Sequence, residues 1–329
     1  MTCVYYDHFG PAAEVLTLGN IPATAPQQGE VTVRLAVSGV NPSDIKARAG
    51  SRPGVLKPAF PQVIPHSDGA GVIEAVGANV DPARIGERVW IWNGQWQRAF
   101  GTAATHITLP AEQAVRMPAS MSFETGAVLG IPGLTAAEAV FGAGDVSGQT
   151  LMISGGGGTV GFLAVQLAVW AGAKVIATCS PRDMDRVSAA GAHHVFDYRS
   201  DTLADDIMAA NDGVPVDRIL EVEFGVNIGT NADIIKPYGT IAAYGSQIDM
   251  TPTLPFGPLL FKAATIDIIL IYLLPLLERH ERITRLHDAF AVGALKCPVA
   301  QVYPLADCAK AHDAVLAGQR TGAILLDCS

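Results

Sequence analysis

A glycine cluster is the part of this sequence whose spacing most clearly indicates chemistry. Gly156, Gly158 and Gly161 satisfy the pattern G-x-G-x-x-G between an apolar run at 150–154 and an Ala-rich run at 162–171. Side-chain-free residues at this spacing permit a tight strand-to-helix turn and let a pyrophosphate approach backbone N–H groups at the start of the helix. The expected amide donors are Gly157, Thr159 and Val160. In this context the pattern favours a dinucleotide site over a glycine turn without a ligand.

The residues after the second expected strand, at 174–178, indicate which dinucleotide binds. An NAD site usually has Asp or Glu there, whose carboxylate bonds the ribose hydroxyls. This chain has Ser180, followed by Arg182 and Arg186. Such arginines hold a 2′-phosphate by charge-assisted hydrogen bonds, although Asp183 between them dilutes the positive charge. The sequence therefore favours NADPH over NADH, with Ser180 and Arg182 as expected contacts and Arg186 as the alternative arginine.

Two kinds of segment must position this site. Up to about residue 120, short β-prone runs such as 31–37 and 71–77 alternate with turn residues, which predicts an all-β unit. From about residue 122, Ala-rich helical stretches alternate with apolar runs, including those at 218–222 and 240–244. That alternation is typical of βαβ units around a parallel sheet. The chain is therefore expected to be an α/β protein of two domains, as its 329 residues also suggest.

Composition excludes several function classes. A formal net charge of −9 argues against nucleic acid as a partner, because phosphate binding needs a clustered basic surface. The N-terminus shows no signal-peptide pattern. The most apolar run, 266–277, contains Asp267 and Pro275 and is too short to span a bilayer, so no membrane partner is expected. The odd, scattered set of five cysteines indicates neither disulfides nor a zinc knuckle and fits a cytoplasmic location.

Several motifs in sequence order resemble the NADPH:quinone oxidoreductase (zeta-crystallin-like) branch of the zinc-independent medium-chain dehydrogenases and reductases. Besides the glycine loop, the matching segments are 40–44, 65–77, 86–89 and 130–136. The resemblance covers nearly the whole chain. It implies a GroES-like β-barrel domain built from residues 1–121 and 262–329, and a Rossmann domain with a doubly wound parallel sheet at 122–261.

The resemblance also implies roles for individual residues. Asn41 and Thr135 are expected near the nicotinamide, as the catalytic pair. Ser180 and Tyr198 are expected around the adenosine phosphate, and Gly245 and Ser246, at a later strand end, are further cofactor candidates.

No metal is expected. Zinc-dependent relatives need a cysteine near the position of Asn41, a His-Glu pair near His66 and a four-cysteine lobe, since zinc takes thiolate and imidazole ligands at close quarters. Here Ser67 follows His66, and no cysteine cluster occurs between residues 90 and 115. His66 is therefore interpreted as a hydrogen-bonded structural histidine.

Without a metal to polarise a carbonyl, the expected substrate is a small quinone or an activated enone, which accepts hydride readily once oriented. Two alternatives stay open: reduction of a carbon–carbon double bond in an enone or enoyl thioester, and a non-catalytic NADPH-binding role. Candidate acceptor-pocket residues, which are as readily interpreted as core or rim of the β-rich unit, are Lys46, Arg52, Trp92, Trp96 and Phe100.

A β-prone stretch at 265–273 bears on assembly. It is expected at the edge of the Rossmann sheet, where unpaired backbone groups invite pairing with another chain. In the related enzymes the corresponding strand pairs with its two-fold mate, so a C₂ homodimer is expected. The alternative is a strand or helix buried within one subunit.

Overall fold

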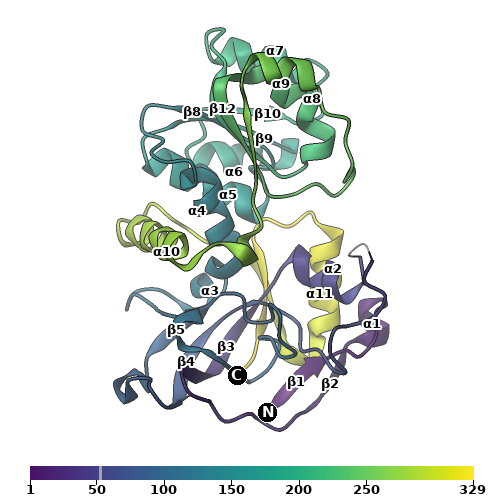
Figure 1. Ribbon diagram of the computed structural model, residues 1–329, viewed down its shortest axis with the longest axis vertical. Helices are drawn as coiled ribbons and strands as arrows, with labels where there is room; N and C mark the ends of the chain where they lie inside the picture. The colour runs from purple at the N-terminus through teal and green to yellow at the C-terminus, as the bar shows by residue number, and fades with distance from the viewer. Residues whose placement is uncertain (52–53) are drawn as a thin grey trace. The chain divides into compact units, whose positions relative to one another are not determined.

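The structure is a computed structural model that describes residues 1–51 and 54–329, so Arg52 lies outside the described residues. Two compact units are present. The first comprises Met1–Ile131 with Cys297–Ser329, and the second comprises Pro132–Lys296. Figure 1 shows the ribbon, with labels on its helices and on some of its strands.

The first unit is built mostly on antiparallel strand pairs, with one parallel pair, β14 with β15. Its seven-stranded sheet has the order β14-β15-β3-β4-β5-β7, and β6 pairs with β3 as well. Its strands are β3 (Glu30–Val40), β4 (Asp68–Val76), β5 (Arg88–Ile91), β6 (His106–Pro110), β7 (Ala114–Arg116), β14 (Val299–Pro304) and β15 (Ala323–Asp327). A separate two-stranded sheet joins β1 (Thr2–Tyr5) to β2 (Thr17–Asn20). The short helices are α1 (Ala12–Val15), α2 (Pro42–Arg48), α3 (Phe123–Gly126) and α11 (Cys308–Ala317).

Strand β3 organises this unit. Val31, Val33, Leu35 and Val37 alternate along it and are almost completely buried, as a strand with one face on the core requires. One side of β3 pairs with β4 along most of its length. The other side is shared: residues 30–34 pair with β6, and residues 37–40 pair with β15 from the far end of the sequence. Residues from both ends of the chain therefore complete one core.

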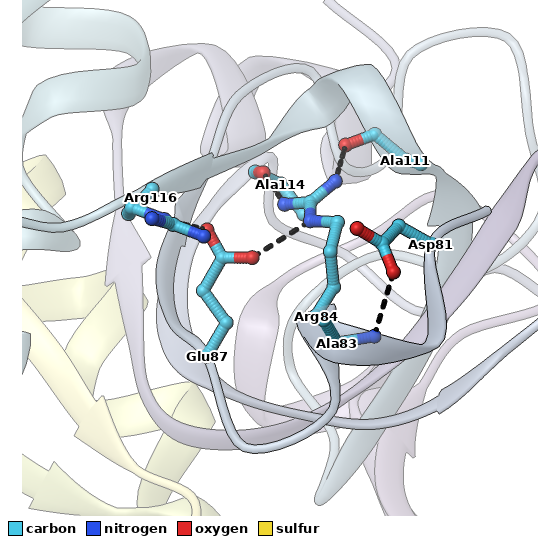
Figure 2. A network of polar contacts seen from close by, with 7 residues as sticks. All are labelled: Asp81, Ala83, Arg84, Glu87, Ala111, Ala114 and Arg116. Atoms are coloured by element: carbon cyan, nitrogen blue, oxygen red, sulfur yellow. Dashed lines mark hydrogen bonds and ion pairs between the residues drawn. The ribbon is translucent and has the colours of Figure 1, made fainter.

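The Gly86–Val89 motif has a structural role in this unit. Glu87 accepts hydrogen bonds from Arg84 Nε at 2.7 Å and from Arg116 Nε at 2.6 Å. Arg84 also donates to the carbonyl oxygens of Ala111 and Ala114, as Figure 2 shows. Burial opposes ionisation of Glu87, but the bonds from the two arginines hold its pKa below the ordinary value. This network fastens the turn η1 (Pro82–Arg84) to the segment that leads into β7.

The second unit contains a parallel sheet of six strands in the order β10-β9-β8-β11-β12-β13, the doubly wound order of a Rossmann domain. The strands are β8 (Thr150–Ile153), β9 (Lys174–Cys179), β10 (His194–Asp197), β11 (Val216–Glu221), β12 (Ile235–Ala243) and β13 (Thr265–Ile268). Strands β8, β9, β11 and β12 occupy the segments expected from the apolar runs. Strand β10 was not expected, because its four residues are only half-buried and mix polar with apolar types.

Helices connect these strands. Helix α5 (Thr159–Trp170) packs on α4 (Leu134–Phe141) and α10 (Leu276–Ala291). Elsewhere α8 (Phe224–Ile234) packs on α7 (Leu203–Ala210) and α9 (Phe256–Phe261), and α6 (Met184–Ala189) packs on β9 and β10. Helix α5 is apolar on all sides because neighbours cover it, and Leu163, Val165 and Leu167 are completely buried. None of the described helices is both long and apolar enough to cross a bilayer.

The boundaries between the units differ from those expected at residues 121/122 and 261/262. Helix α3 packs on β3, β4 and β5, so the first unit extends to Ile131. Strand β13 pairs in parallel with β12, and α10 packs on α4 and α5, so residues up to Lys296 belong to the second unit. Backbone pairing at the edge of the parallel sheet decides the second boundary. The β-prone stretch at 265–273 was expected at this edge, whereas the boundary that the resemblance implied lies just before it.

Candidate functional site

The glycine loop lies between β8 and α5, beside the position where the strand order reverses from β8 to β11. Gly156 donates its N–H to the carbonyl of Thr178 at 2.8 Å, and a Cβ there would lie 3.2 Å from Ala177 and Val187. A Cβ at Gly161 would lie 2.2 Å from the carbonyl oxygen of Gly155. The two glycines therefore allow the loop, the sheet and the helix to pack in contact.

The residues of the predicted anion site lie at the start of α5. Gly158 is the N-cap residue, and its carbonyl accepts the N–H of Phe162 at 2.8 Å. The first turn of a helix leaves N–H groups without carbonyl partners inside the helix, and the helix dipole favours an anion there. Thr159, Val160 and Gly161 form this turn, and Gly157 precedes it. The structure thus brings the predicted pyrophosphate residues together at one helix terminus.

A charged cluster lies at the end of β9. Asp183 is buried and accepts hydrogen bonds from Ser180 Oγ at 2.9 Å, from Arg182 Nε at 3.2 Å and from Arg186 Nη2 at 3.1 Å. Burial opposes the charge on Asp183, but the bonds from Ser180 and the two arginines hold its pKa below the ordinary value. The carboxylate therefore stays ionised and fixes three cofactor candidates at the rim of the glycine loop. We call Ser180, Arg182, Asp183 and Arg186 the Asp183 cluster.

The two arginines of the Asp183 cluster differ in position. Arg186 donates to the carbonyl of Gly157 at 2.5 Å, and its guanidinium carbon lies 4.6 Å from the ring centroid of Phe162. Its side chain is 23% exposed, whereas that of Arg182 is 46% exposed. The sequence favoured Arg182 as the phosphate contact. In the structure Arg186 is the arginine that touches the glycine loop directly, and Arg182 lies farther out.

The remaining cofactor candidates of this unit lie at two other strand ends. Tyr198 follows β10, is exposed, and donates its backbone N–H to Cys179 at 3.4 Å, which places it beside Ser180. Gly245 and Ser246 follow β12. Ser246 Oγ accepts the N–H of Gly225 at 2.9 Å and donates to the carbonyl of Asp249, so this hydroxyl stabilises the loop itself.

Asn41, in the first unit, is fixed by two carboxylates. It precedes α2, and its backbone N–H donates to Asp44 Oδ2 at 2.8 Å. Its side-chain Nδ2 donates to Asp68 Oδ2 at 2.7 Å. Asp68 is completely buried, and burial raises its pKa well above the ordinary value, although the bond from Asn41 acts in the opposite direction. The Asn41 side chain therefore has one defined orientation, set by Asp68.

The other candidate site residues lie in both units, and their burial differs. Thr135 is buried in the first turn of α4, in the second unit. In the first unit, Lys46 is exposed, Trp92 is buried and Trp96 is half-buried. Phe100 packs against the core and lines a cavity of about 260 Å³ together with Arg98 and His106.

Sequence reasoning missed Asp68 and Asp183 as positioning residues. Asp68 lies inside a matched motif but gave no separate signal. Asp183 appeared only to dilute the positive charge of its neighbours, although it holds them in place. Its spacing of three residues from both Ser180 and Arg186 was the available signal, since residues that far apart meet on one side of a helical turn.

Comparison with known proteins agrees with this geometry. Residues 27–119 match the alcohol dehydrogenase GroES-like domain, and residues 159–288 match the zinc-binding dehydrogenase family. The pig (Sus scrofa) protein named quinone oxidoreductase is 28% identical over 332 residues, covering 99% of this chain and 97% of that protein. The human quinone oxidoreductase is 28% identical over 328 residues, covering 98% and 95%.

Solved structures give the same result. A quinone oxidoreductase of Pseudomonas syringae superposes with a TM-score of 0.87 at 28% identity, covering 99% of both chains. An Escherichia coli quinone oxidoreductase, solved in complex with NADPH, also has a TM-score of 0.87, at 25% identity over 99% of this chain. The likeness extends over both units and over the glycine loop. The chain therefore belongs to the quinone oxidoreductase branch of the medium-chain dehydrogenase/reductase superfamily.

Proposed function

We propose that this protein is an oxidoreductase that transfers hydride from NADPH to a quinone or a similarly activated carbonyl acceptor, without a metal ion at the reacting centre. The observation that carries the proposal is its end-to-end similarity to quinone oxidoreductases, one of which was solved with NADPH. NADPH supplies the hydride when bound. The residues of this chain bind it, orient it and fix the groups around the acceptor.

The Asp183 cluster and the glycine loop fit the two phosphate-bearing parts of NADPH. The amides at the start of α5 suit the pyrophosphate. Two guanidinium groups and one carboxylate leave the Asp183 cluster with one net positive charge, and the Ser180 hydroxyl adds a donor. A 2′-phosphate would replace part of the Asp183 contact with charge-assisted bonds to Arg186 and Arg182. NADH lacks that phosphate, so the arginines would stay paired with Asp183.

At the end of the site where the acceptor binds, hydride transfer depends on how the acceptor is oriented. A quinone is already electrophilic, so the protein needs to hold it against the nicotinamide in a site that excludes water. We assign Asn41 and Thr135 to this end, as the resemblance implies. Because Asp68 binds Asn41 Nδ2, the amide is held in place before any ligand arrives. Preorganised polar groups stabilise a developing oxyanion better than mobile ones.

The decisive test is consumption of NADPH and NADH by the purified protein across a panel of quinones, enones, enoyl thioesters and aldehydes. We expect turnover with quinones and a kcat/KM at least tenfold higher with NADPH than with NADH. Faster turnover of enones or enoyl thioesters would support the double-bond reductase instead. Tight NADPH binding with no turnover of any acceptor would support the non-catalytic role.

We further propose that the protein forms a C₂ homodimer through strand β13. This strand is the edge of the parallel sheet, and Ile268 is 80% exposed. Pairing with a second copy would satisfy its backbone groups and cover the exposed side chains of Ile268, Leu270 and Leu273. Light scattering should give twice the mass of one chain, and Leu270→Lys should shift the mass toward monomer. Leu316→Lys, at an exposed leucine on α11, is the control. A monomeric wild type would contradict the proposal.

We also propose that the protein is cytoplasmic. All five cysteines lie in the described part of the chain and are free thiols, which suits a reducing compartment.

A further inference from the structure

Three buried side chains of the first unit converge at a place unrelated to the glycine loop. His66 lies just before β4, and Cys308 and His312 lie four residues apart on one side of α11. All three are at most 1% exposed. The Nε2 atoms of His66 and His312 are 2.9 Å apart, and Cys308 Sγ lies 4.0 Å from His66 Nε2. One ligand atom from each residue lies within 4.8 Å of the other two. We call these residues the His66 cluster.

Neighbouring hydroxyls orient His66. Thr102 Oγ1 donates to the carbonyl of Asp68 at 2.5 Å, and Ser38 Oγ lies 2.8 Å from Thr102 Oγ1. Ser38 can therefore donate to Thr102 and accept Nδ1–H of His66, whose Nδ1 lies 2.9 Å from Ser38 Oγ. That tautomer leaves a lone pair on His66 Nε2, directed at His312 and Cys308. An outer hydrogen bond of this kind is typical of a metal-binding histidine.

The backbone at His66 supports the same interpretation. Its φ is +78°, in the left-handed region that residues with a Cβ rarely adopt. Such a conformation persists only where surrounding contacts maintain it, and it often marks a functional position. Here it accompanies a ring held between Ser38 and His312.

Burial favours the neutral form of both imidazoles, which is the form that binds metal ions. Burial, and then the neighbouring His312, lower the pKa of His66 well below its ordinary value. Burial, and then the charge of Arg48, lower the pKa of His312 to about 3. Burial raises the pKa of the Cys308 thiol. His312 Nδ1 has no hydrogen-bond partner within the described chain.

We propose that His66, Cys308 and His312 form a buried site for one soft monovalent cation, Cu(I). Two imidazole nitrogens and one thiolate arranged as a triangle are a typical copper ligand set. Structural zinc sites almost always have four protein ligands, whereas this cluster provides three. With bond lengths of about 2.0 Å to nitrogen and 2.3 Å to sulfur, a planar set needs ligand atoms roughly 3.5 to 3.8 Å apart. The observed spacings bracket that range.

The net charge of the occupied site favours a monovalent ion over a divalent one. Binding displaces the Cys308 proton, so Cu⁺ and Cys–SH give Cu–S–Cys and H⁺ with no change of oxidation state. The proton between the two rings moves to His312 Nδ1. The occupied site is then neutral, whereas Zn²⁺ would leave one buried positive charge near Arg48. An uncompensated buried charge is strongly unfavourable. The ion would also join α11 to the segment preceding β4, two parts of the chain more than 240 residues apart.

The test is an anaerobic titration of the purified full-length protein with Cu(I) in competition with a chromophoric Cu(I) chelator. We expect one equivalent per chain to be withheld from the chelator. X-ray absorption of the copper-loaded wild type should show two nitrogens and one sulfur. Two or more sulfurs around the copper, or withholding of Zn²⁺ in preference to Cu(I), would overturn the proposal.

Variants identify the ligands. Cys308→Ser and His312→Gln should each weaken Cu(I) binding at least 100-fold and abolish the copper-induced rise in Tm. Cys297→Ser, at a cysteine outside the His66 cluster, is the matched control and should bind as the wild type does. Circular dichroism verifies that each variant is folded. Undiminished binding by a folded Cys308→Ser variant would refute the assignment, and the wild-type absorption measurement decides the matter if that variant does not fold.

Discussion

The Asp183 cluster and the His66 cluster are both built from titratable side chains, but they differ in every physical respect. The Asp183 cluster is charged, lies partly in solvent, and is contained within seven consecutive residues, 180–186. The His66 cluster is completely buried and is assembled from two segments more than 240 positions apart. Charge is retained where water and counter-charges stabilise it. Where burial removes the water and no opposite charge lies close by, the neutral forms of ionisable groups are favoured.

The largest effect is expected in the glycine loop, which lies beside the Asp183 cluster and not beside residues of the His66 cluster in the sequence. Gly161→Val should reduce NADPH affinity more than 100-fold, about 3 kcal/mol, because a Cβ at this position lies 2.2 Å from the carbonyl of Gly155 and must displace the loop. Isothermal titration calorimetry measures this loss. Gly229→Ala is the control, since a Cβ there meets nothing within 4 Å. Unchanged NADPH affinity in a folded Gly161→Val protein would show that the loop does not hold the pyrophosphate.

Acid stability tests the neutrality of the His66 cluster. An unfolded imidazole has a pKa of about 6.5, whereas His312 in the folded protein has a pKa of about 3. Between these values the unfolded chain binds a proton that the folded chain does not. The free energy of unfolding should therefore fall by about 1.4 kcal/mol per pH unit for this group as the pH drops below 6.5.

His312→Gln removes that contribution. Urea unfolding at pH 6.5, 5.5 and 4.5 should show a shallower decline for this variant than for the wild type, and His8→Gln, at an exposed histidine, should follow the wild type. Burial of Asp68 acts in the opposite direction, since its raised pKa favours the folded state in acid, but it does so equally in all three proteins. Parallel curves for wild type and His312→Gln would mean that this imidazole is already charged in the folded protein.

Within the Asp183 cluster, the arginines should differ in importance. Arg186→Ala should weaken NADPH binding about 10- to 30-fold, because Arg186 is the more buried arginine and contacts both Gly157 and Phe162. Arg182→Ala should weaken it less, since its side chain is half exposed. NADH binding, measured in parallel, should hardly change in either variant. A larger loss from Arg182→Ala would reverse this order.

The smallest effect concerns Asn41. Asn41→Ala should lower kcat about tenfold while changing the NADPH dissociation constant by less than threefold, if its amide orients the acceptor end without contributing to binding at the phosphates. Steady-state kinetics with one quinone and a direct binding titration separate the two quantities. An equal loss in both would make Asn41 a general binding residue.

The same contrast explains what the sequence could predict. The local spacing of residues 150–161 predicts a strand, a loop and the start of a helix. The structure has β8, the glycine loop and the start of α5 there. The closeness of Ser180, Arg182 and Arg186 could likewise be predicted, because they share one short turn. The sequence near His66 does not indicate Cys308 and His312 as its neighbours. They come close to it only because β15 pairs with β3 and α11 packs in the same unit. Strand β13 was expected at the edge of the parallel sheet and lies there, whereas the boundary at 261/262, which the resemblance implied, would put it in the first unit.

The shared edge of β3 has a consequence for synthesis on the ribosome. Residues 37–40 pair with β15, yet the whole second unit, 132–296, is translated between them. At 5 to 20 residues per second, those residues take roughly 8 to 33 s to emerge. The second unit, which is continuous in sequence, can fold during that interval. The first cannot complete its sheet until residues 323–327 appear, so the backbone groups of residues 37–40 that pair with β15 stay unpaired for that time.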